Sequence, residues 1–309
     1  MNTVASETEP VVSIVIPTFN RLKTLKQVIH SYLEQEGVKE IIFVDDAGSD
    51  GTENYLRQLQ DEQPKVVYIR QDRNRGLPTA RNTGAEAATG DYVLFGEDDL
   101  RLCPEYALRL VRCLEKQGGS IAAGRILFPF PGESDEEALR RTNTTVDDRL
   151  DRRRLAFNAS APADNAIRVP FIHAISLVRK DVFDTVRYDP GYRGNAYREE
   201  TDFYLRAGQS GHKIFFCPDA LCVHLPREVQ QLGGSMSRGI WVYKYWSLRN
   251  NYRFLRRHYR YLRQNKIVED SFLTLMASFA LAEFKKVPSF YLRKFSPATY
   301  SWLASRLNK

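Results

Sequence analysis

Apolar runs alternate with segments of helical character through the first hundred residues. Four short runs are apolar at most positions, which is the pattern of strands buried on both faces of a sheet. They lie at residues 11–17, 40–44, 65–70 and 92–95. Helices are predicted between them at 22–33, where apolar residues recur every three or four positions, at 52–63 and at 79–88. This alternation predicts an α/β fold with a mostly parallel, Rossmann-like sheet flanked by helices.

The chain from residue 100 to about 226 continues this pattern less regularly. The predicted elements are a helix at 104–117, strands at 120–128, 169–178, 213–216 and 220–224, and a helix that starts within 194–203. The stretch 129–154 is charged and has little apolar periodicity. A long loop inside a compact domain is usually functional or disordered, and we predict such a loop here.

The last part of the chain has a strongly amphipathic pattern. From Trp241 onward, large apolar residues are separated alternately by four and three positions, which places them on one stripe of a helix. They are Trp241, Tyr245, Leu248, Tyr252, Leu255, Tyr259 and Leu262. Arginines repeat this spacing one position later and form a cationic band beside the stripe: Arg249, Arg253, Arg256, Arg260 and Arg263.

Such a helix suits two different surroundings. It can lie in a membrane interface beside anionic lipid, or it can pack on the rest of the protein with a solvated basic flank. Nucleic-acid binding is the weaker interpretation, because no recognised binding module accompanies the arginines. A second apolar segment, 272–284, is expected to cover the first helix or to enter the interface, and it is too short to span a bilayer.

Charge is distributed unevenly along the chain. Residues 236–309 contain 15 Lys and Arg against 3 Asp and Glu, a net charge of +12, whereas residues 1–235 contain 30 and 35, a net charge of −5. This asymmetry predicts a polyanionic surface as a partner of the basic part. We therefore expect a main domain at 1–235 and a basic, amphipathic helical region at 236–309.

The cysteines and the N-terminus favour a cytoplasmic protein. The four cysteines are scattered and lack the density of a disulfide scaffold, which fits a reducing cytosol: Cys103, Cys113, Cys217 and Cys222. The first ten residues are polar and acidic, so no signal peptide is expected. Cys217, Cys222 and His224 could suggest zinc, but no second ligand pair accompanies them.

Carboxylates cluster at the ends of two predicted strands. Asp45 and Asp46 follow the second strand, and Glu97, Asp98 and Asp99 follow the fourth. The carboxyl ends of parallel strands share one edge of a sheet, where ligands bind in open α/β folds. Acids there can hold Mg²⁺ or Mn²⁺ together with substrate phosphates, although a charge run alone can equally be a solvated turn. The glycine fingerprint of nicotinamide enzymes and the P-loop motif do not occur, which argues against both classes.

A third group of acids opens the helix predicted near residue 199. Glu199, Glu200 and Asp202 suit the positive end of a helix dipole, and that alone can explain them. A carboxylate beside a metal–diphosphate site can instead act as a general base toward an incoming hydroxyl. The two interpretations remain open at this point.

Five segments together resemble family-two glycosyltransferases of the GT-A fold. They occur in the family's order, and the resemblance covers about residues 11–226. The segments are 13–20 (SIVIPTFN), 44–52 (VDDAGSDGT), 80–84 (ARNTG), 97–99 (EDD) and 199–202 (EETD). The resemblance implies a GT-A catalytic domain at 1–235 that transfers a sugar, with inversion, from a nucleotide-diphosphate donor.

The resemblance also implies a donor site. Asp46 would read the base, with Pro17 and Phe19 lining the same pocket. Arg81, in the ARNTG segment, is assigned to the nucleotide-sugar site, and Asp98 would approach the ribose or the metal.

The metal and base positions follow in the same way. Asp99 would coordinate Mn²⁺ or Mg²⁺, and His224 falls where some members supply a further ligand. Glu200 occupies the place of the catalytic base, which is commonly an aspartate, so Glu199 remains an alternative. Glu97 stands where a first aspartate is common, and its role is left open.

These expectations combine into one functional hypothesis. The chain is predicted to be a metal-dependent glycosyltransferase of the hexosyl or deoxyhexosyl class, in polysaccharide or cell-envelope biosynthesis. It would act at the inner face of the membrane on a glycan or lipid-linked acceptor, with an anionic membrane surface and no nucleic acid as partner. The alternative is a non-catalytic nucleotide-sugar-binding or scaffolding protein on the same fold.

Overall fold

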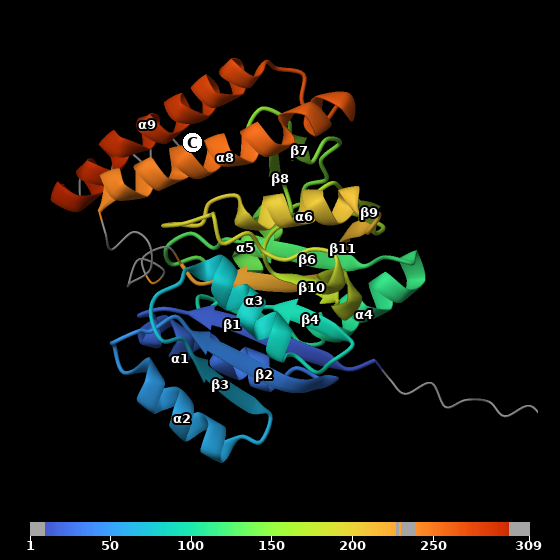
Figure 1. Ribbon diagram of the computed structural model, residues 1–309, viewed down its shortest axis with the longest axis vertical. Coiled ribbons are helices and arrows are strands. Elements are labelled where there is room, and N and C mark those ends of the chain that lie inside the picture. Colours follow the sequence, from blue (N-terminus) through green and yellow to red (C-terminus); the bar gives the residue numbers. More distant parts are fainter. Residues whose placement is uncertain (1–9, 227–228, 230–238, 297–309) are drawn as a thin grey trace, which may run out of the picture.

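A nine-stranded sheet forms the centre of the structure, a computed structural model that describes residues 10–226, 229 and 239–296 (Figure 1). Its strands are β1 (Val12–Thr18), β2 (Val38–Asp45), β3 (Val66–Arg70), β4 (Tyr92–Phe95), β5 (Leu100–Leu102), β6 (Ile121–Leu127), β9 (Ile167–Arg168), β10 (Ser176–Arg179) and β11 (Ile214–His224). They follow the order β3-β2-β1-β4-β10-β6-β11-β5, with β9 paired to β11.

The first half of the sheet is the predicted parallel α/β unit. β3, β2, β1 and β4 are all parallel, and the helices between them are α1 (Leu22–Leu33), α2 (Thr52–Glu62) and α3 (Leu77–Ala87). Every residue of β1 and β4 is buried, as their continuous apolar runs predict. The α/β prediction is therefore confirmed, and the carboxyl ends of these strands share one edge.

One glycine allows α3 to approach the sheet closely. A Cβ atom on Gly84 would lie 2.2 Å from Cγ1 of Val15 in β1, which is far closer than two carbon atoms can approach. The absence of a side chain at this position lets α3 lie directly on β1, with Arg81 one turn earlier on the same helix.

The second half of the sheet is mixed; two of its predicted strands differ from the prediction, and β5 and β9 were not predicted. β10 pairs antiparallel with β4 and β6, and the predicted strand 169–178 is formed only at its end. The two strands predicted around Pro218 are one strand, β11, whose register against β6 shifts between Phe216 and Leu221. A proline cannot donate to the ladder, and the irregularity accommodates it.

The stretch 129–154 is more ordered than the loop predicted for it. It contains a short helix, α5 (Asp135–Arg141), and one strand of a small hairpin, β7 (Leu150–Asp151) with β8 (Ala156–Phe157). A capping box starts α5: the Ser134 hydroxyl accepts from the Glu137 amide, and the Glu137 carboxylate accepts from the Ser134 amide. These local hydrogen bonds fix a helix that apolar periodicity does not reveal.

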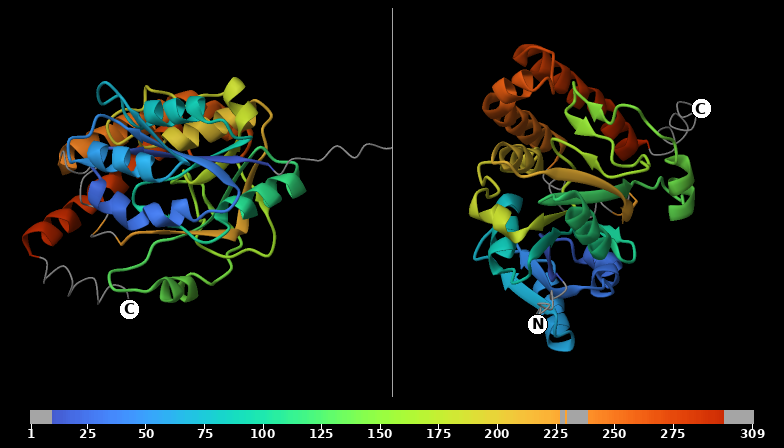
Figure 2. Two further views of the ribbon diagram at one scale, coloured as in Figure 1. Left: turned by 90° about the horizontal axis from the view of Figure 1, so that it is seen from below. Right: turned by 90° about the vertical axis from the view of Figure 1, so that its right-hand side faces the viewer.

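Two long helices follow the sheet domain. α8 (Ile240–Gln264) packs near α6 (Glu199–Gln209), and α9 (Phe272–Phe295) packs beside α8, at the opposite end of the molecule from α2 (Figures 1 and 2). No helix among the described residues is long and apolar enough to cross a membrane.

The buried face of α8 is not the predicted apolar stripe. Leu255 and Leu262 of the stripe are buried, but Trp241, Tyr245 and Tyr252 are exposed. The face toward the protein carries several buried polar residues instead: Lys244, Ser247, Asn250, Asn251 and His258. Each of them forms at least one hydrogen bond, which a prediction based on hydrophobicity cannot include.

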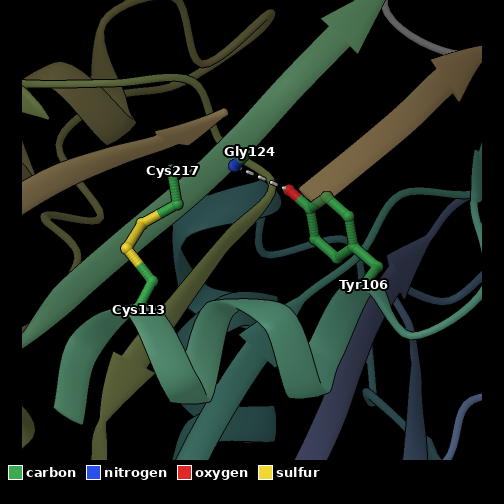
Figure 3. Close-up of a disulfide and its surroundings, with 4 residues drawn as sticks. All are labelled: Tyr106, Cys113, Gly124 and Cys217. Carbon is green, nitrogen blue, oxygen red and sulfur yellow. Dashed lines mark hydrogen bonds between the residues drawn. A yellow bond between two sulfur atoms is a disulfide. The ribbon is translucent and has the colours of Figure 1, made fainter. Parts of the chain in front are cut away.

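A disulfide joins Cys113 to Cys217, whereas the sequence analysis treated the four cysteines as typical of a reducing cytosol (Figure 3). Cys113 lies on α4 (Tyr106–Gln117) and Cys217 on β11, 104 residues apart in sequence and 6.4 Å apart between Cα atoms. The helix also reaches the sheet through the Tyr106 hydroxyl, which accepts from the Gly124 amide of β6. Because Cys217 is bonded to Cys113, it is not a ligand of the zinc site considered above.

Candidate functional site

A cavity of about 330 Å³ opens at the carboxyl ends of β1, β2 and β4. Five parts of the chain line it: the end of β1 and the following turn, the residue after β2, the turn before α3 with the start of α3, the acidic segment after β4, and the loop before α6. The lining residues are Pro17, Thr18, Phe19, Arg21, Asp46, Asn74, Gly76, Leu77, Ala80, Gly96–Asp99 and Gly194–Ala196. The structure thus brings together Pro17, Phe19, Asp46, Asp98 and Asp99, which the sequence analysis assigned to one site.

Asp46 anchors one wall of the cavity. It is 5% exposed, and its two carboxylate oxygens accept hydrogen bonds of 2.7 and 2.8 Å from the amides of Arg75 and Gly76. Each carboxylate oxygen has two lone pairs, so these bonds leave acceptor capacity. Asp46 therefore shapes the turn that faces the cavity and can still accept from a ligand N–H.

Arg21 lies among the acids that follow β4. Its Nε is 3.2 Å from Oδ1 of Asp98, and its Nη2 pairs with Asp99. The Thr18 hydroxyl donates to the other oxygen of Asp98. Burial raises the pKa of Asp98, Arg21 lowers it, and Asp99 raises it further; the net shift is upward. The sequence analysis missed Arg21, although it directly follows the SIVIPTFN segment.

Three side chains form a possible metal centre beside these acids. Glu97, Asp99 and His224 each offer one ligand atom, and these atoms lie within 4.8 Å of one another. His224 Nδ1 is 3.8 Å from Asp99 Oδ1, and among the described residues this buried nitrogen has no hydrogen-bond partner. Burial lowers the pKa of His224, which favours the neutral, ligating imidazole. Two carboxylates and an imidazole fit Mn²⁺ or Mg²⁺, so the expected group suits these residues.

Glu97 belongs to this centre, although the sequence analysis left its role open. Burial raises its pKa, Asp99 adds to the shift, and Arg81 opposes it. Two adjacent acids with raised pKa values, Glu97 and Asp98, mark a site at which a cation would be stabilised.

The two candidate bases have different surroundings. Glu199 is buried, and its Oε1 lies 2.9 Å from Nε of Arg81, whose Nη2 is 3.6 Å from Glu97. Burial raises the pKa of Glu199 and Arg81 opposes that rise. Glu200 is only partly buried and forms no hydrogen bond or ion pair within the described parts of the chain.

Arg81 lies behind the cavity and not on its wall. Its side chain is 1% exposed, and its guanidinium is 5.3 and 5.5 Å from the ring centroids of Phe95 and Tyr188. Arg81 thus contacts Glu199 from behind the cavity, and the contact with the donor that the resemblance implies for it stays a prediction.

The family is decided by comparison with known proteins. The sequence profile described as "Glycosyl transferase family 2" matches residues 13–187, which include β1 to β4 and the acids that follow them. The chain belongs to glycosyl transferase family 2. It is 23% identical over 232 residues to glycosyltransferase AglE of Haloferax volcanii, covering 74% of this chain and 71% of the relative.

Two further comparisons place this glycosyltransferase among known proteins. It is 35% identical over 130 residues to the GalNAc(5)-diNAcBac-PP-undecaprenol beta-1,3-glucosyltransferase of Campylobacter jejuni, covering 41% of this chain and 42% of the relative. A crystal structure of GalNAc-T7 with UDP, GalNAc and Mn²⁺ superposes with a TM-score of 0.56 at 19% identity, over 70% of this chain and 43% of that protein. The latter likeness confirms the GT-A fold.

In this glycosyltransferase, α8 holds the cavity wall formed by residues 194–196. Asn195 donates to the Ser247 hydroxyl and the Tyr243 carbonyl of α8, and Asn250 donates to the Arg193 carbonyl. The backbone is strained in this wall and just after it, since Ala196 has a φ of 52° and Arg198 a φ of 74°. None of these contacts was predicted; the recurrence of polar residues at helical spacing on α8 is the signal that could have indicated them.

Asp202 provides a second link between the candidate base helix and α8. It is fully buried and accepts from the Tyr192 hydroxyl, Arg206 and Arg257, with His258 Nε2 at 2.8 Å. Burial raises the pKa of Asp202, but the bonds to His258 and the two arginines outweigh it and hold the pKa well below its usual range. Asp202 is therefore a structural carboxylate and not a candidate base.

Proposed function

We propose that this family 2 member is an inverting, metal-assisted glycosyltransferase that moves a sugar from a nucleotide-diphosphate donor to a hydroxyl of a glycan or lipid-linked acceptor. The observation that carries the proposal is that Asp46, Glu97 and Asp99 line one cavity. His224 lies within ligand distance of Glu97 and Asp99, and Glu200 is close enough to Glu97 to raise its pKa.

The donor's nucleotide would occupy the Asp46 side of the cavity. Pro17, Phe19 and Leu77 supply apolar walls suited to the faces of a flat base. Asp46 would accept the base N–H, since it is already oriented by the Arg75 and Gly76 amides. A nucleotide bound there would place its diphosphate near the acids after β4, which line the same cavity.

The metal would be held by Glu97, Asp99 and His224, with Asp98 near the ribose or the ion. A bound Mn²⁺ or Mg²⁺ acts as a Lewis acid that stabilises the charge developing on a leaving diphosphate. Arg21, which pairs with Asp98 and Asp99, would provide positive charge at the same place.

Glu200 would act as the general base. It lies close enough to Glu97 and Glu199 to raise the pKa of both, and it has the freedom that the paired Glu199 lacks. One carboxylate that removes the acceptor proton is sufficient for a single displacement, which inverts the sugar carbon. Hydrolases of sugars need a second carboxylate partner and no nucleotide pocket.

We further propose that the helical region after the sheet domain docks on an anionic membrane at its inner face. The outer side of α8 presents Trp241, Tyr245 and Tyr252 together with exposed Arg256, Arg260 and Arg263. Aromatic rings beside arginines favour the headgroup region of an anionic bilayer. The name of the Campylobacter jejuni relative includes an undecaprenol-linked acceptor, which supports a lipid-linked acceptor here.

A thermal-shift screen tests the catalytic proposal. Purified protein is heated with UDP, GDP, dTDP or CMP, each with and without Mn²⁺; a ligand that binds only the folded state raises the Tm. We expect one nucleotide to give a shift that requires Mn²⁺ and that Asp99→Ala loses while the Tm without ligand is kept. No shift with any nucleotide would refute the donor assignment. A shift without any sugar transfer would favour the non-catalytic alternative.

A further inference from the structure

Two phenylalanines beside the metal centre are exposed to solvent. Phe128 and Phe130 directly follow β6, and their exposed fractions are 49% and 51%. Within residues 10–226 they are the only large apolar side chains that are exposed. All other large apolar side chains of the sheet domain are at least partly buried. Two exposed rings at one position therefore indicate a binding surface.

Phe128 contacts His224, one of the three residues of the metal centre. Its ring stacks on the His224 ring, with centroids 4.8 Å apart and an interplanar angle of 19°. His224 Nε2 is in turn 3.8 Å from Glu97 Oε2, and its Nδ1 is 3.8 Å from Asp99 Oδ1. A molecule resting on Phe128 would therefore be next to the reacting groups.

The segment that carries the rings is held in place by Arg141. The guanidinium lies 3.9 Å from the centroid of the Phe130 ring, and Nη2 donates to the Phe128 carbonyl. Arg141 also pairs with Glu133, which accepts from the Phe130 amide. Because these bonds fix the backbone before any ligand arrives, little ordering entropy remains to be lost on binding.

The chemistry of an exposed, fixed aromatic ring matches one face of a sugar. A pyranose presents several C–H groups on one face, and their slight positive charge is attracted by the electron-rich face of an aromatic ring. Neither ring lines the cavity assigned to the donor. We infer that Phe128 and Phe130 form the acceptor subsite, where a pyranose ring of the acceptor stacks beside the metal centre; this rests on the proposed function.

The inference can be tested without knowing the natural acceptor. The probes are methyl glycosides of glucose, galactose, N-acetylglucosamine and N-acetylgalactosamine, added with Mn²⁺ and the nucleotide selected by the thermal-shift screen. Saturation-transfer NMR measures their binding and shows which sugar protons touch the protein. The variants are Phe128→Ala, Phe130→Ala and the aromatic replacement Phe128→Trp, with Phe284→Ala on α9 as a control that also removes an exposed phenylalanine.

We expect at least one glycoside to bind through the protons of one ring face. Phe128→Ala and Phe130→Ala should weaken this binding about fivefold or more, while Phe128→Trp and Phe284→Ala retain it. The nucleotide-induced rise in Tm should be the same in all four variants. That control separates loss of the acceptor subsite from loss of the donor site.

Three results would overturn the inference. One is glycoside binding that the two alanine variants leave unchanged, and another is nucleotide binding with no glycoside binding at all. The third is a loss of affinity for the nucleotide sugar, but not for the nucleotide or the glycosides, which would assign the rings to the donor sugar. A protein that binds no nucleotide would instead refute the proposed function itself.

Discussion

The Nε atom of Arg81 lies 2.9 Å from Oε1 of Glu199, and both side chains are almost completely shielded, with exposed fractions of 1% and 2%. This ion pair distinguishes two adjacent glutamates that the sequence leaves as alternatives. Glu199, at the start of α6, is paired with the buried Arg81 of α3, whereas Glu200 has no such partner among the described residues. A base must give up its proton to solvent or product in every cycle, and Glu200 has the freedom to do so.

Glu200→Gln should abolish sugar transfer and leave folding and donor binding intact. Removing a general base typically costs a factor of about 10²–10⁴ in kcat. The measurement is the release of nucleoside diphosphate from the selected donor, with the nucleotide-induced rise in Tm as the binding readout. The variant Glu53→Gln serves as a control, because Glu53 lies on α2 outside the cavity and pairs with the partly exposed Arg57 and Arg70.

Glu199→Gln should instead lower stability, because it removes the closer of the two carboxylates that pair with the buried Arg81 and leaves only Glu97, at 3.6 Å. Breaking a buried pair costs about 3–5 kcal/mol, and a Tm lower by roughly 5–10 °C is expected for a domain of this size. If Glu199→Gln keeps the Tm and loses transfer while Glu200→Gln remains active, the two assignments must be exchanged.

The sequence predicts those residues of the site that follow directly from a local pattern of apolar and polar positions. Asp46 and Asp99 follow buried strands, and parallel strands necessarily bring their carboxyl ends to one edge. Arg21 was missed because it reaches Asp99, 78 residues away, and no periodicity reports such a contact.

The contacts that α8 makes with the sheet domain were not predicted, for a related physical reason. Its aromatic stripe is the strongest hydrophobic signal, yet the buried face combines polar residues with apolar ones such as Phe254 and Leu262. The cost of burying Ser247 and Asn250 is offset by hydrogen bonds to Asn195 and Arg193, which lie 52 and 57 residues away in sequence. Whether these polar residues stabilise the packing of α8 depends on hydrogen-bonding partners that lie outside the helix.

Arg21→Gln should increase the affinity for Mn²⁺ in the absence of nucleotide. The Arg21 guanidinium pairs with Asp98 and Asp99, so a metal ion must compete with its charge. We expect the Kd for Mn²⁺ to fall about tenfold, which corresponds to about 1.4 kcal/mol. Free Mn²⁺ is measured by electron paramagnetic resonance during titration.

Two companion variants make the Mn²⁺ measurement specific. Arg109→Gln removes an exposed arginine that pairs with Glu105 and should leave the Kd unchanged. Asp99→Asn should abolish binding. Equal or weaker Mn²⁺ binding by Arg21→Gln would mean that the arginine supports the metal centre and does not compete with the ion.

The Cys113–Cys217 bond should be detectable by counting thiols. Protein denatured without reductant should present two thiols, those of Cys103 and Cys222, and four after reduction. Because the bond closes a loop of about a hundred residues, Cys113→Ser should lower the free energy of unfolding by up to about 4–5 kcal/mol. Cys103→Ser is the matched control. Four thiols before reduction would show that the bond does not form in the purified protein.

The outward faces of α8 and α9 should bind anionic vesicles. On α9, Leu273, Leu281, Phe284 and Phe295 are all exposed, and their spacings of 8, 3 and 11 residues return to one side of a helix. This side is continuous with the aromatic face of α8, because Trp241 lies 6.4 Å from Phe284 between ring centroids and donates to the Tyr291 hydroxyl. Such a surface, with arginines along one edge, matches an interfacial helix pair.

Vesicle flotation separates the apolar and electrostatic parts of this binding. Wild-type protein should float with phosphatidylcholine vesicles that contain phosphatidylserine, and far less with phosphatidylcholine alone. Arg256→Gln with Arg260→Gln should weaken binding about tenfold or more at low salt and reduce its salt dependence, because each arginine near the surface adds attraction to anionic lipid. Leu281→Ser with Phe284→Ser should weaken binding to both kinds of vesicle.

Phe128→Ala is the control for this experiment, since it removes an exposed ring far from α9 in the sequence and should not change flotation. Equal binding to both kinds of vesicle would exclude a role for the arginines, and the surface would then be purely apolar. No binding to either kind would refute the membrane proposal while leaving the catalytic one intact, because the donor cavity is lined by residues 17–196 and contains no side chain of α8 or α9.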